Sequence, residues 1–197
     1  MLKRSACALL GGLALAACSG DARDPLSVEK IEARSCEPGT NAQEWTVNDT
    51  RYLGCLTAEG QMQGDVVNYH GGETRRTLAQ FERDVRNGRY VQWYPSGSKL
   101  VQGQFVKGLA EGEWIWWWED GRRRMVASFA EGQLDGPIEA WHPNGVQSVS
   151  GAMRLGASYG DMHFWDAEGR AAEALERPLP WDVAAISAAR PDPAPRP

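Results

Sequence analysis

Aromatic residues recur at a fixed interval along the chain, and each closes a short segment that begins with glycine. The interval is 24 residues, and a further glycine follows each tryptophan by four positions. A fixed period of this length indicates a repeat architecture. The aromatic positions are Tyr69, Trp93, Trp117, Trp141 and Trp165. We therefore expect five repeats, which start at Gly64, Gly88, Gly112, Gly136 and Gly160.

Each repeat has the composition of a β-hairpin. The segment before the tryptophan is rich in aromatic and β-branched residues, which favour strands. Dipeptides such as Asn144-Gly145 follow it and supply the positive φ angles of a tight turn. A second strand such as 99–106 and a five-residue glycine-bounded link such as 108–112 complete the unit. Connections this short make neighbouring strands antiparallel.

Glycine frequency excludes a helical repeat. A glycine falls at about every eighth residue, and each would destabilise a helix by near 1 kcal/mol. The pattern predicts an all-β fold, an elongated single-layer antiparallel sheet of stacked β-hairpins with about 24 residues each. Ten such strands would make a sheet roughly 45–50 Å long.

The repeat resembles a known family. The pattern Gly-x-Trp/Tyr-x-x-Trp-x-x-Asn/Asp-Gly is similar to the bacterial variant of the MORN repeat and covers residues 60–174. Such repeats also occur in proteins described as antitoxin components of toxin–antitoxin systems. The resemblance implies a curved sheet that acts in binding or scaffolding. Residues 36–59 keep Trp45 in the aromatic column but lack its glycines, as expected of a degenerate terminal cap.

The first residues have the pattern of an export signal. Lys3 and Arg4 precede a short apolar run that ends at residue 17, which is too short for a membrane span and fits a signal peptide. Residues 15–18 resemble a bacterial lipobox, which implies cleavage before Cys18 and a lipid anchor on it; an ordinary signal peptide is the alternative. Residues 18–35 then form a tether. Ser19 resembles the sorting pattern for the outer membrane, so we expect an envelope protein that faces the periplasm.

Cysteine number and charge agree with export. Cys36 and Cys55 are the two cysteines that follow the signal peptide and the lipidated position. An even pair of cysteines in an oxidising compartment predicts a disulfide, and two free buried thiols are the alternative. The formal charge is −5, and it becomes −7 without Lys3 and Arg4. An acidic chain argues against nucleic acid and against broad binding to anionic lipid. Residues 175–197 are rich in proline and are expected to form a disordered tail.

Candidate catalytic chemistry is sparse in this sequence. The histidines His70, His142 and His163 are scattered, and neither a Gly-x-Ser-x-Gly motif nor a Cys–His pair with family spacing is present. Arg122 and Arg124 of the Arg-Arg-Arg run would share one strand face, beside acidic residues that point to solvated charge. We expect no enzyme activity, no metal and no cofactor.

Side chains alternate across a strand, so each repeat has two columns. The constant aromatic column fits a packing position. The other column varies, and Trp114, Trp116 and Trp118 share it in the central repeat. If exposed, these rings would form an apolar contact surface together with Tyr94 and Phe164. The alternative is that both faces need aromatic packing, and that the tail or the cap covers this one.

The combined expectation is a lipid-anchored, non-catalytic binding or scaffolding surface for a protein or cell-wall partner at the membrane. One alternative is an antitoxin-type protein that neutralises a cognate toxin, and a second is a structural spacer. An open sheet leaves edge strands that can pair with another copy. The cap and the tail would block these edges, so we expect a monomer without nucleic acid.

Overall fold

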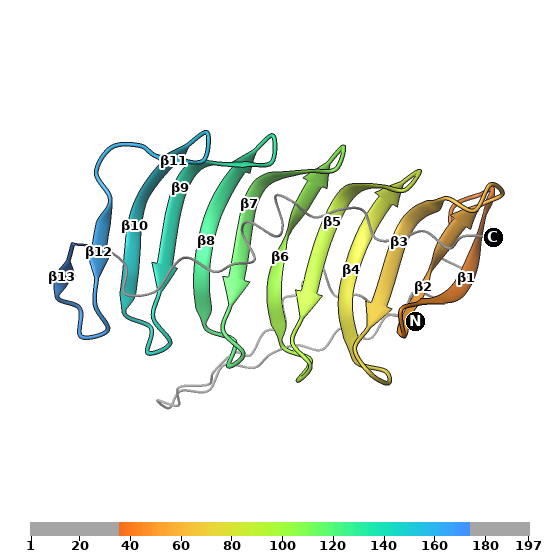
Figure 1. Cartoon of the computed structure of the whole chain (residues 1–197), viewed down its shortest axis with the longest axis horizontal. Coiled ribbons are helices and arrows are strands. Elements are labelled where there is room, and N and C mark those ends of the chain that lie inside the picture. The colour runs from red at the N-terminus through yellow and green to blue at the C-terminus, as the bar shows by residue number, and fades with distance from the viewer. Residues whose placement is uncertain (1–35, 174–197) are drawn as a thin grey trace, which may run out of the picture. The chain divides into compact units, whose positions relative to one another are not determined.

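The structure is a computed structural model that describes residues 36–173, and these residues form one antiparallel β-sheet (Figure 1). None of the described residues is helical. The predicted all-β fold class is therefore confirmed. The strands are β1 (Thr40–Val47), β2 (Thr50–Thr57), β3 (Met62–Tyr69), β4 (Arg75–Glu82), β5 (Val85–Trp93), β6 (Lys99–Val106), β7 (Leu109–Trp117), β8 (Arg123–Ala130), β9 (Gln133–Trp141), β10 (Gln147–Arg154), β11 (Ala157–Ser158), β12 (His163–Trp165) and β13 (Ala171–Ala172).

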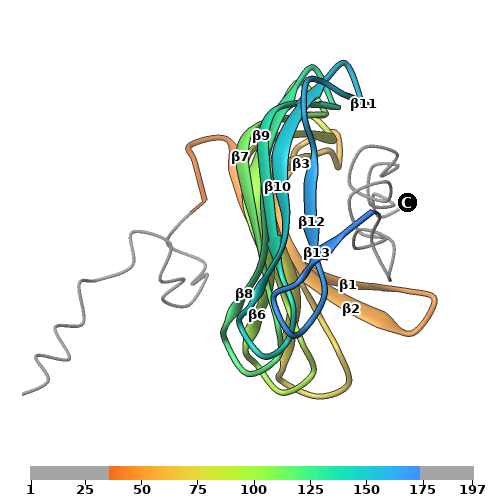
Figure 2. The same cartoon turned by 90° about the vertical axis from the view of Figure 1, so that its left-hand side faces the viewer.

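From β1 to β10, each strand pairs with the strand that follows it in the chain. The order runs from β1 to β10 without a crossover, then continues to β12 and β13, while β11 pairs with β10. Seen along its length, the sheet is a single layer (Figure 2). The stacked-hairpin prediction is thus confirmed. The last repeat is reduced, because β12 spans three residues and β13 two.

Two kinds of connection alternate, and they lie at opposite ends of the strands. We call the two sides of the sheet that they form the hairpin-loop edge and the link edge. On the hairpin-loop edge, the loop after β5 is closed by bonds from Gly97 N to Tyr94 O (2.9 Å) and from Tyr94 N to Ser98 O (2.9 Å). On the link edge, tight turns such as Lys107-Gly108 hold both residues at positive φ, 50° and 84°. This is the geometry of a two-residue hairpin turn whose twist matches the flanking strands.

The expected five-residue link is wrong. After the turn at Gly108, β7 begins at once with Leu109, and Gly112 lies inside the strand at a φ of 69°. The register between β6 and β7 shifts beside it, between Gln102 and Gln104. In the link 108–112 the second glycine therefore marks a β-bulge, because glycine adopts positive φ without a steric penalty.

One face of the sheet carries the main hydrophobic core, and we call it the core face. Large side chains on it alternate with small ones from strand to strand. Tyr90 pairs with Ala79 on one side and Gly103 on the other, and Trp114 pairs with Ala127. Small partners leave room for bulky rings on the adjacent strands, which favours close packing. The largest fully buried residues of this core are Trp114, Trp116, Leu56, Met62, Met125 and Ile138.

Core packing therefore lies on the opposite face from the one the sequence indicated. Trp114 and Trp116 of the variable column are 0% exposed, whereas Trp93 and Trp117 of the constant column are only half-buried. The constant aromatics lie on the other face, which we call the outer face. A smaller buried group on that face consists of Val67, Leu78 and Val91.

The predicted disulfide is confirmed. Cys36 and Cys55 are bonded, with their Cα atoms 5.6 Å apart, and the bond ties the segment before β1 to β2. Cys18, the signal peptide, the tether and the proline-rich tail lie outside the described residues. Between residues 36 and 173, no helix has the length and apolar character to cross a membrane.

Candidate functional site

The residues that the sequence proposed as a contact surface occupy two different environments. Trp114 and Trp116 lie inside the core, with ring centroids 6.1 Å apart. The Trp114 ring also packs against Tyr90 at 5.7 Å and Phe105 at 5.2 Å. These two tryptophans therefore pack in the core, as the alternative expectation from the sequence had it, and do not form a contact surface. Trp118, Tyr94 and Phe164 are half-buried, and a contact role for them stays a prediction.

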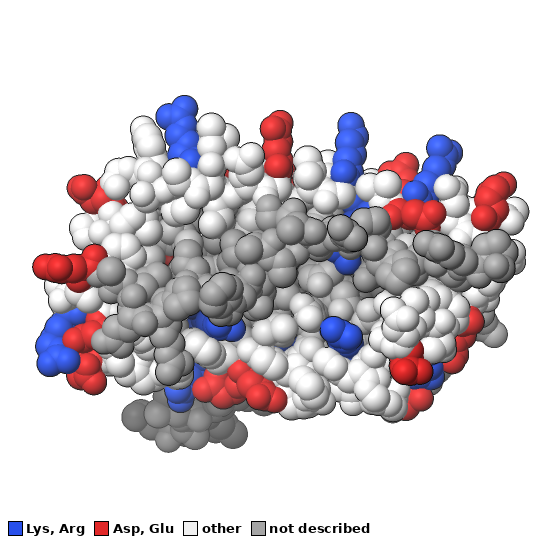
Figure 3. Space-filling view, in the orientation of Figure 1, with Lys and Arg blue, Asp and Glu red and all other residues white. Residues whose placement is uncertain are grey.

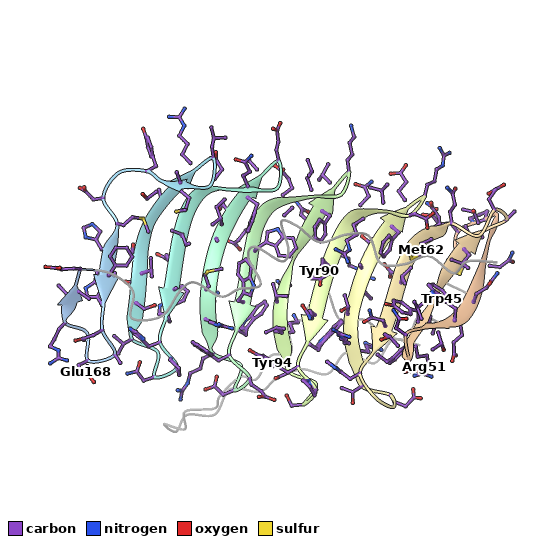
Figure 4. The ribbon with its side chains drawn as sticks, in the orientation of Figure 1. Trp45, Arg51, Met62, Tyr90, Tyr94 and Glu168 are labelled. Carbon is purple, nitrogen blue, oxygen red and sulfur yellow. A yellow bond between two sulfur atoms is a disulfide. The ribbon has the colours of Figure 1, made fainter. Side chains whose placement is uncertain are left out.

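Some side chains that follow the constant aromatics bond to the next repeat. The Tyr94 hydroxyl donates to Trp117 O at 3.0 Å, and His70 Nε2 lies 3.0 Å from Trp93 O. His142 Nε2 makes the same contact with the following repeat, at 2.8 Å. Tyr94 lies near the hairpin-loop edge, whereas Tyr90 lies midway along its strand (Figure 4). These bonds fix the carbonyls of Trp93, Trp117 and Trp165, although the residues that make them differ in type.

The link edge has a second set of bonds between repeats. Glu111 Oε2 accepts from the backbone N–H of Glu131 at 3.0 Å, and Asn87 Oδ1 accepts from that of Lys107 at 3.2 Å. Backbone bonds run beside them, such as Gly132 N to Ala110 O at 2.9 Å. Both edges are therefore tied from repeat to repeat, which favours a stiff sheet.

The outer face presents a regular line of aromatic and basic side chains near the hairpin-loop edge. We call it the aromatic–basic row. Its aromatic members close β3, β5, β7, β9 and β12, and its basic members come from the strands between them or precede the first. Each of three aromatic residues is paired in register with a basic residue of the next strand. The row consists of Arg51, Tyr69, Arg75, Trp93, Lys99, Trp117, Arg123, Trp141 and Trp165.

Rings and cations in the row contact one another. The Arg51 guanidinium lies 4.1 Å from the centroid of the Tyr69 ring, and Lys99 Nζ lies 5.6 Å from that of Trp117. Lys99 is in register with Trp93, so it stands between two tryptophans. Successive aromatics are two strands apart, which spaces them about 9.6 Å from each other. All five aromatic residues of the row are partly exposed.

Arg51 at the start of the row is held in place by acidic neighbours. Its guanidinium is 3.1 Å from Glu73 and 3.9 Å from Glu44, and it donates to Gly72 O at 3.3 Å. The hydrogen bond to Glu73 raises the pKa of Arg51 above its usual value, so the group keeps its charge at every relevant pH. Ion pairs as exposed as these contribute little to stability.

Arg122 and Arg124, which the sequence placed on one strand face beside acidic residues, have different partners in the structure. Arg122 donates to Pro143 O at 2.9 Å and lies 3.7 Å from Asp120, whereas the Arg124 guanidinium lies 4.6 Å from the Trp118 ring. Only Arg123 of the three belongs to the row. Along the upper, link edge, acidic and basic side chains are mixed (Figure 3).

A shallow hollow of about 390 Å³ lies at the β1–β2 end. Glu37, Glu59, Glu82 and Arg83 are among its lining residues, and no histidine or cysteine lines it. Within residues 36–173, no group of three or more His, Cys, Asp or Glu side chains is arranged to hold a metal ion. The hollow is therefore a polar site with several carboxylates in its lining.

Sequence reasoning identified the aromatic members of the row but not the basic ones. Arg51, Arg75, Lys99 and Arg123 stand 24 residues apart, so the same period that revealed the tryptophans carried this signal. Neither a family model nor a curated protein matches the chain.

Proposed function

We propose that this chain is a non-catalytic binding protein, held at the cell envelope through a lipid on Cys18, whose MORN-like sheet presents one extended surface to a protein or cell-wall partner. The aromatic–basic row is that surface. The observation that carries the proposal is its regularity: partly exposed aromatics about 9.6 Å apart, with cations between them.

Rigidity supports a binding role. Bonds from Tyr94, His70 and His142 fix the backbone beside the row, so a partner meets a surface that is already ordered. Preorganised groups bind with less loss of conformational entropy. Aromatic and arginine side chains are also the residues that dominate binding energy in interfaces. Apolar patches with a polar rim mark such sites on soluble proteins.

Site-specific photocrosslinking in intact cells tests the proposal. A photoreactive residue placed at Trp93 or Trp141 should give a discrete crosslinked product. The same residue at Lys107 or Leu155, on the exposed link edge, should give none. Equal products from both edges, or none from the row, would contradict the assigned surface. A stoichiometric toxin on the row would instead support the antitoxin-type alternative, and no partner on either edge would support the spacer.

Membrane attachment has its own test. The Cys18→Ser variant should leave the membrane fraction for the soluble periplasmic fraction, because two or more acyl chains are needed for stable anchoring. Metabolic labelling with a fatty acid should mark the wild-type chain and not the variant. Unchanged fractionation with no label on either chain would contradict the lipid anchor.

A further inference from the structure

We infer that the ligand of the aromatic–basic row is a linear acidic glycan, a chain of β-linked sugars with about one carboxylate in each disaccharide. This rests on the proposed function and names the partner of that same surface. Two independent features of the row point to it: a constant spacing in one direction, and alternation of ring and cation along that direction.

Spacing is the first feature. Neighbouring aromatics of the row are two strands apart, about 9.6 Å, and this distance repeats from Tyr69 to Trp165 over about 38 Å. A polymer whose repeat matches this spacing can contact every aromatic residue of the row, whereas the surface of a globular partner has no such repeat. The disaccharide unit of an extended β-linked glycan is close to one step. The C–H faces of sugar rings are apolar, so they can stack on half-exposed indoles.

Charge is the second feature. The formal charge of the whole chain is −5, yet Arg51, Arg75, Lys99 and Arg123 stand in line between the rings. No acidic residue belongs to the row itself, and Glu73 and Glu44 form ion pairs with Arg51 at its first position. A local cationic line on an acidic protein favours an anionic ligand that lies along the sheet. Basic residues end at Arg123, because Gln147 and Ala171 hold the later positions.

Because the basic residues occupy only part of the row, the row predicts an orientation of the bound glycan. The carboxylate-bearing part of the glycan should lie over β2 to β8, where the cations are. A neutral or less charged end should lie over β9 to β13, where Trp141 and Trp165 continue without them. Single-stranded nucleic acid also stacks on aromatics in basic grooves, but an acidic chain repels a backbone with a charge at every nucleotide.

Direct titration of the purified full chain tests the inference. The probe is a hyaluronan oligosaccharide series, because it has one carboxylate per disaccharide. Affinity should rise with oligosaccharide length and stop rising once the chain spans the row. Uncharged chitin oligosaccharides should bind at least about tenfold more weakly, or ~1.4 kcal/mol, and so should polyglutamate, which has charge without sugar rings. Tighter binding of single-stranded DNA than of hyaluronan would overturn the inference.

Matched variants assign the binding to the row. Trp117→Ala and Lys99→Ala should each weaken hyaluronan binding about tenfold. The control pair is Tyr159 and Arg154, another ring–cation contact at 5.4 Å, whose ring is 58% exposed and lies off the row. Alanine at either control position should leave affinity unchanged. Equal losses at both pairs would overturn the assignment.

The two proposals fail separately. If the photocrosslinker at Trp93 traps a protein in cells while no hyaluronan oligosaccharide binds the purified chain, the glycan inference is wrong and the binding surface stands. If neither crosslinks nor glycan binding depend on the row, both proposals are wrong. Circular dichroism of each variant shows whether a loss of binding reflects a loss of fold.

Discussion

The Trp114 indole lies directly over Gly103 of the neighbouring strand, where a Cβ on Gly103 would overlap the ring atoms. Glycine is thus the only residue that lets this ring lie flat on the core face. The same arrangement recurs one repeat on, where Ala127 stands beside Ile138. Large and small side chains complement each other across the strands, so the core tolerates different residue types in successive repeats.

Gly103→Ala should destabilise the fold by about 1–3 kcal/mol, because an extra methyl group in a well-packed core forces Trp114 to move. Urea denaturation measures the loss. Gly71→Ala is the control, since a Cβ on Gly71 would meet no other atom within 4 Å and the φ of Gly71 is not in the left-handed region. The control should be close to neutral. A neutral Gly103→Ala would mean that Trp114 does not pack as described.

Trp116→Ala should reduce the free energy of unfolding by about 3–5 kcal/mol, because the residue is 0% exposed in the core. Trp141→Ala should cost much less, because its ring is only half-buried on the outer face. Thermal denaturation of the two variants compares them. If Trp116→Ala folds as stably as Trp141→Ala, the core would have to lie on the other face.

Removal of the disulfide should destabilise the cap. The bond joins cysteines 19 residues apart, and closing a loop of this size contributes roughly 3 kcal/mol. The Cys36→Ser, Cys55→Ser double variant should therefore unfold at a lower urea concentration. Reduced wild-type protein is the matched comparison and should behave like the variant. Identical midpoints for oxidised and reduced protein would contradict a stabilising role.

Asp166 should make the last hairpin sensitive to acid. Its carboxylate accepts from Arg170 N at 2.8 Å and Arg170 Nε at 2.7 Å, and these bonds with Arg170 lower the pKa of Asp166. A lowered folded-state pKa means that the stabilisation is complete above the unfolded value of about 3.9 and is lost as pH falls through the folded value. NMR shifts of the Arg170 amide should follow this titration.

The Asp166→Asn variant is the control for that titration, because it keeps an oxygen acceptor and cannot ionise. Its Arg170 amide should show no titration in this pH range. A wild-type midpoint at or above about 3.9 would contradict the assigned interaction.

The period of the tryptophans was sufficient to predict the hairpins, their antiparallel order and the span 99–106 of one strand. The disulfide followed from the cysteine count. These features depend on local sequence and on simple counting. A tight turn with positive φ at Lys107 and Gly108 was missed, because the paired glycines at 108 and 112 suggested a loop, although the second one marks a bulge.

The core face could not be assigned from the constancy of residue type among the repeats alone. Trp117 recurs as an aromatic in every repeat, yet it lies half-exposed on the outer face. Trp114 varies to Val, Tyr, Ile or Met between repeats, yet it is fully buried, because small partners such as Gly103 and Ala127 compensate for its size. Constancy here reflects a repeated surface feature, and variation reflects complementary packing across strands. The small residues at 24-residue spacing were the signal that could have shown this.

Residue-by-residue tryptophan oxidation, read by mass spectrometry on the full chain, tests the central claim most directly. The account predicts rapid oxidation of Trp93, Trp117, Trp141 and Trp165 on the outer face and protection of Trp114 and Trp116 in the core. Hyaluronan oligosaccharide should then protect the outer tryptophans alone. Rapid oxidation of Trp114 and Trp116 that the ligand suppresses, with no change at the row, would contradict it.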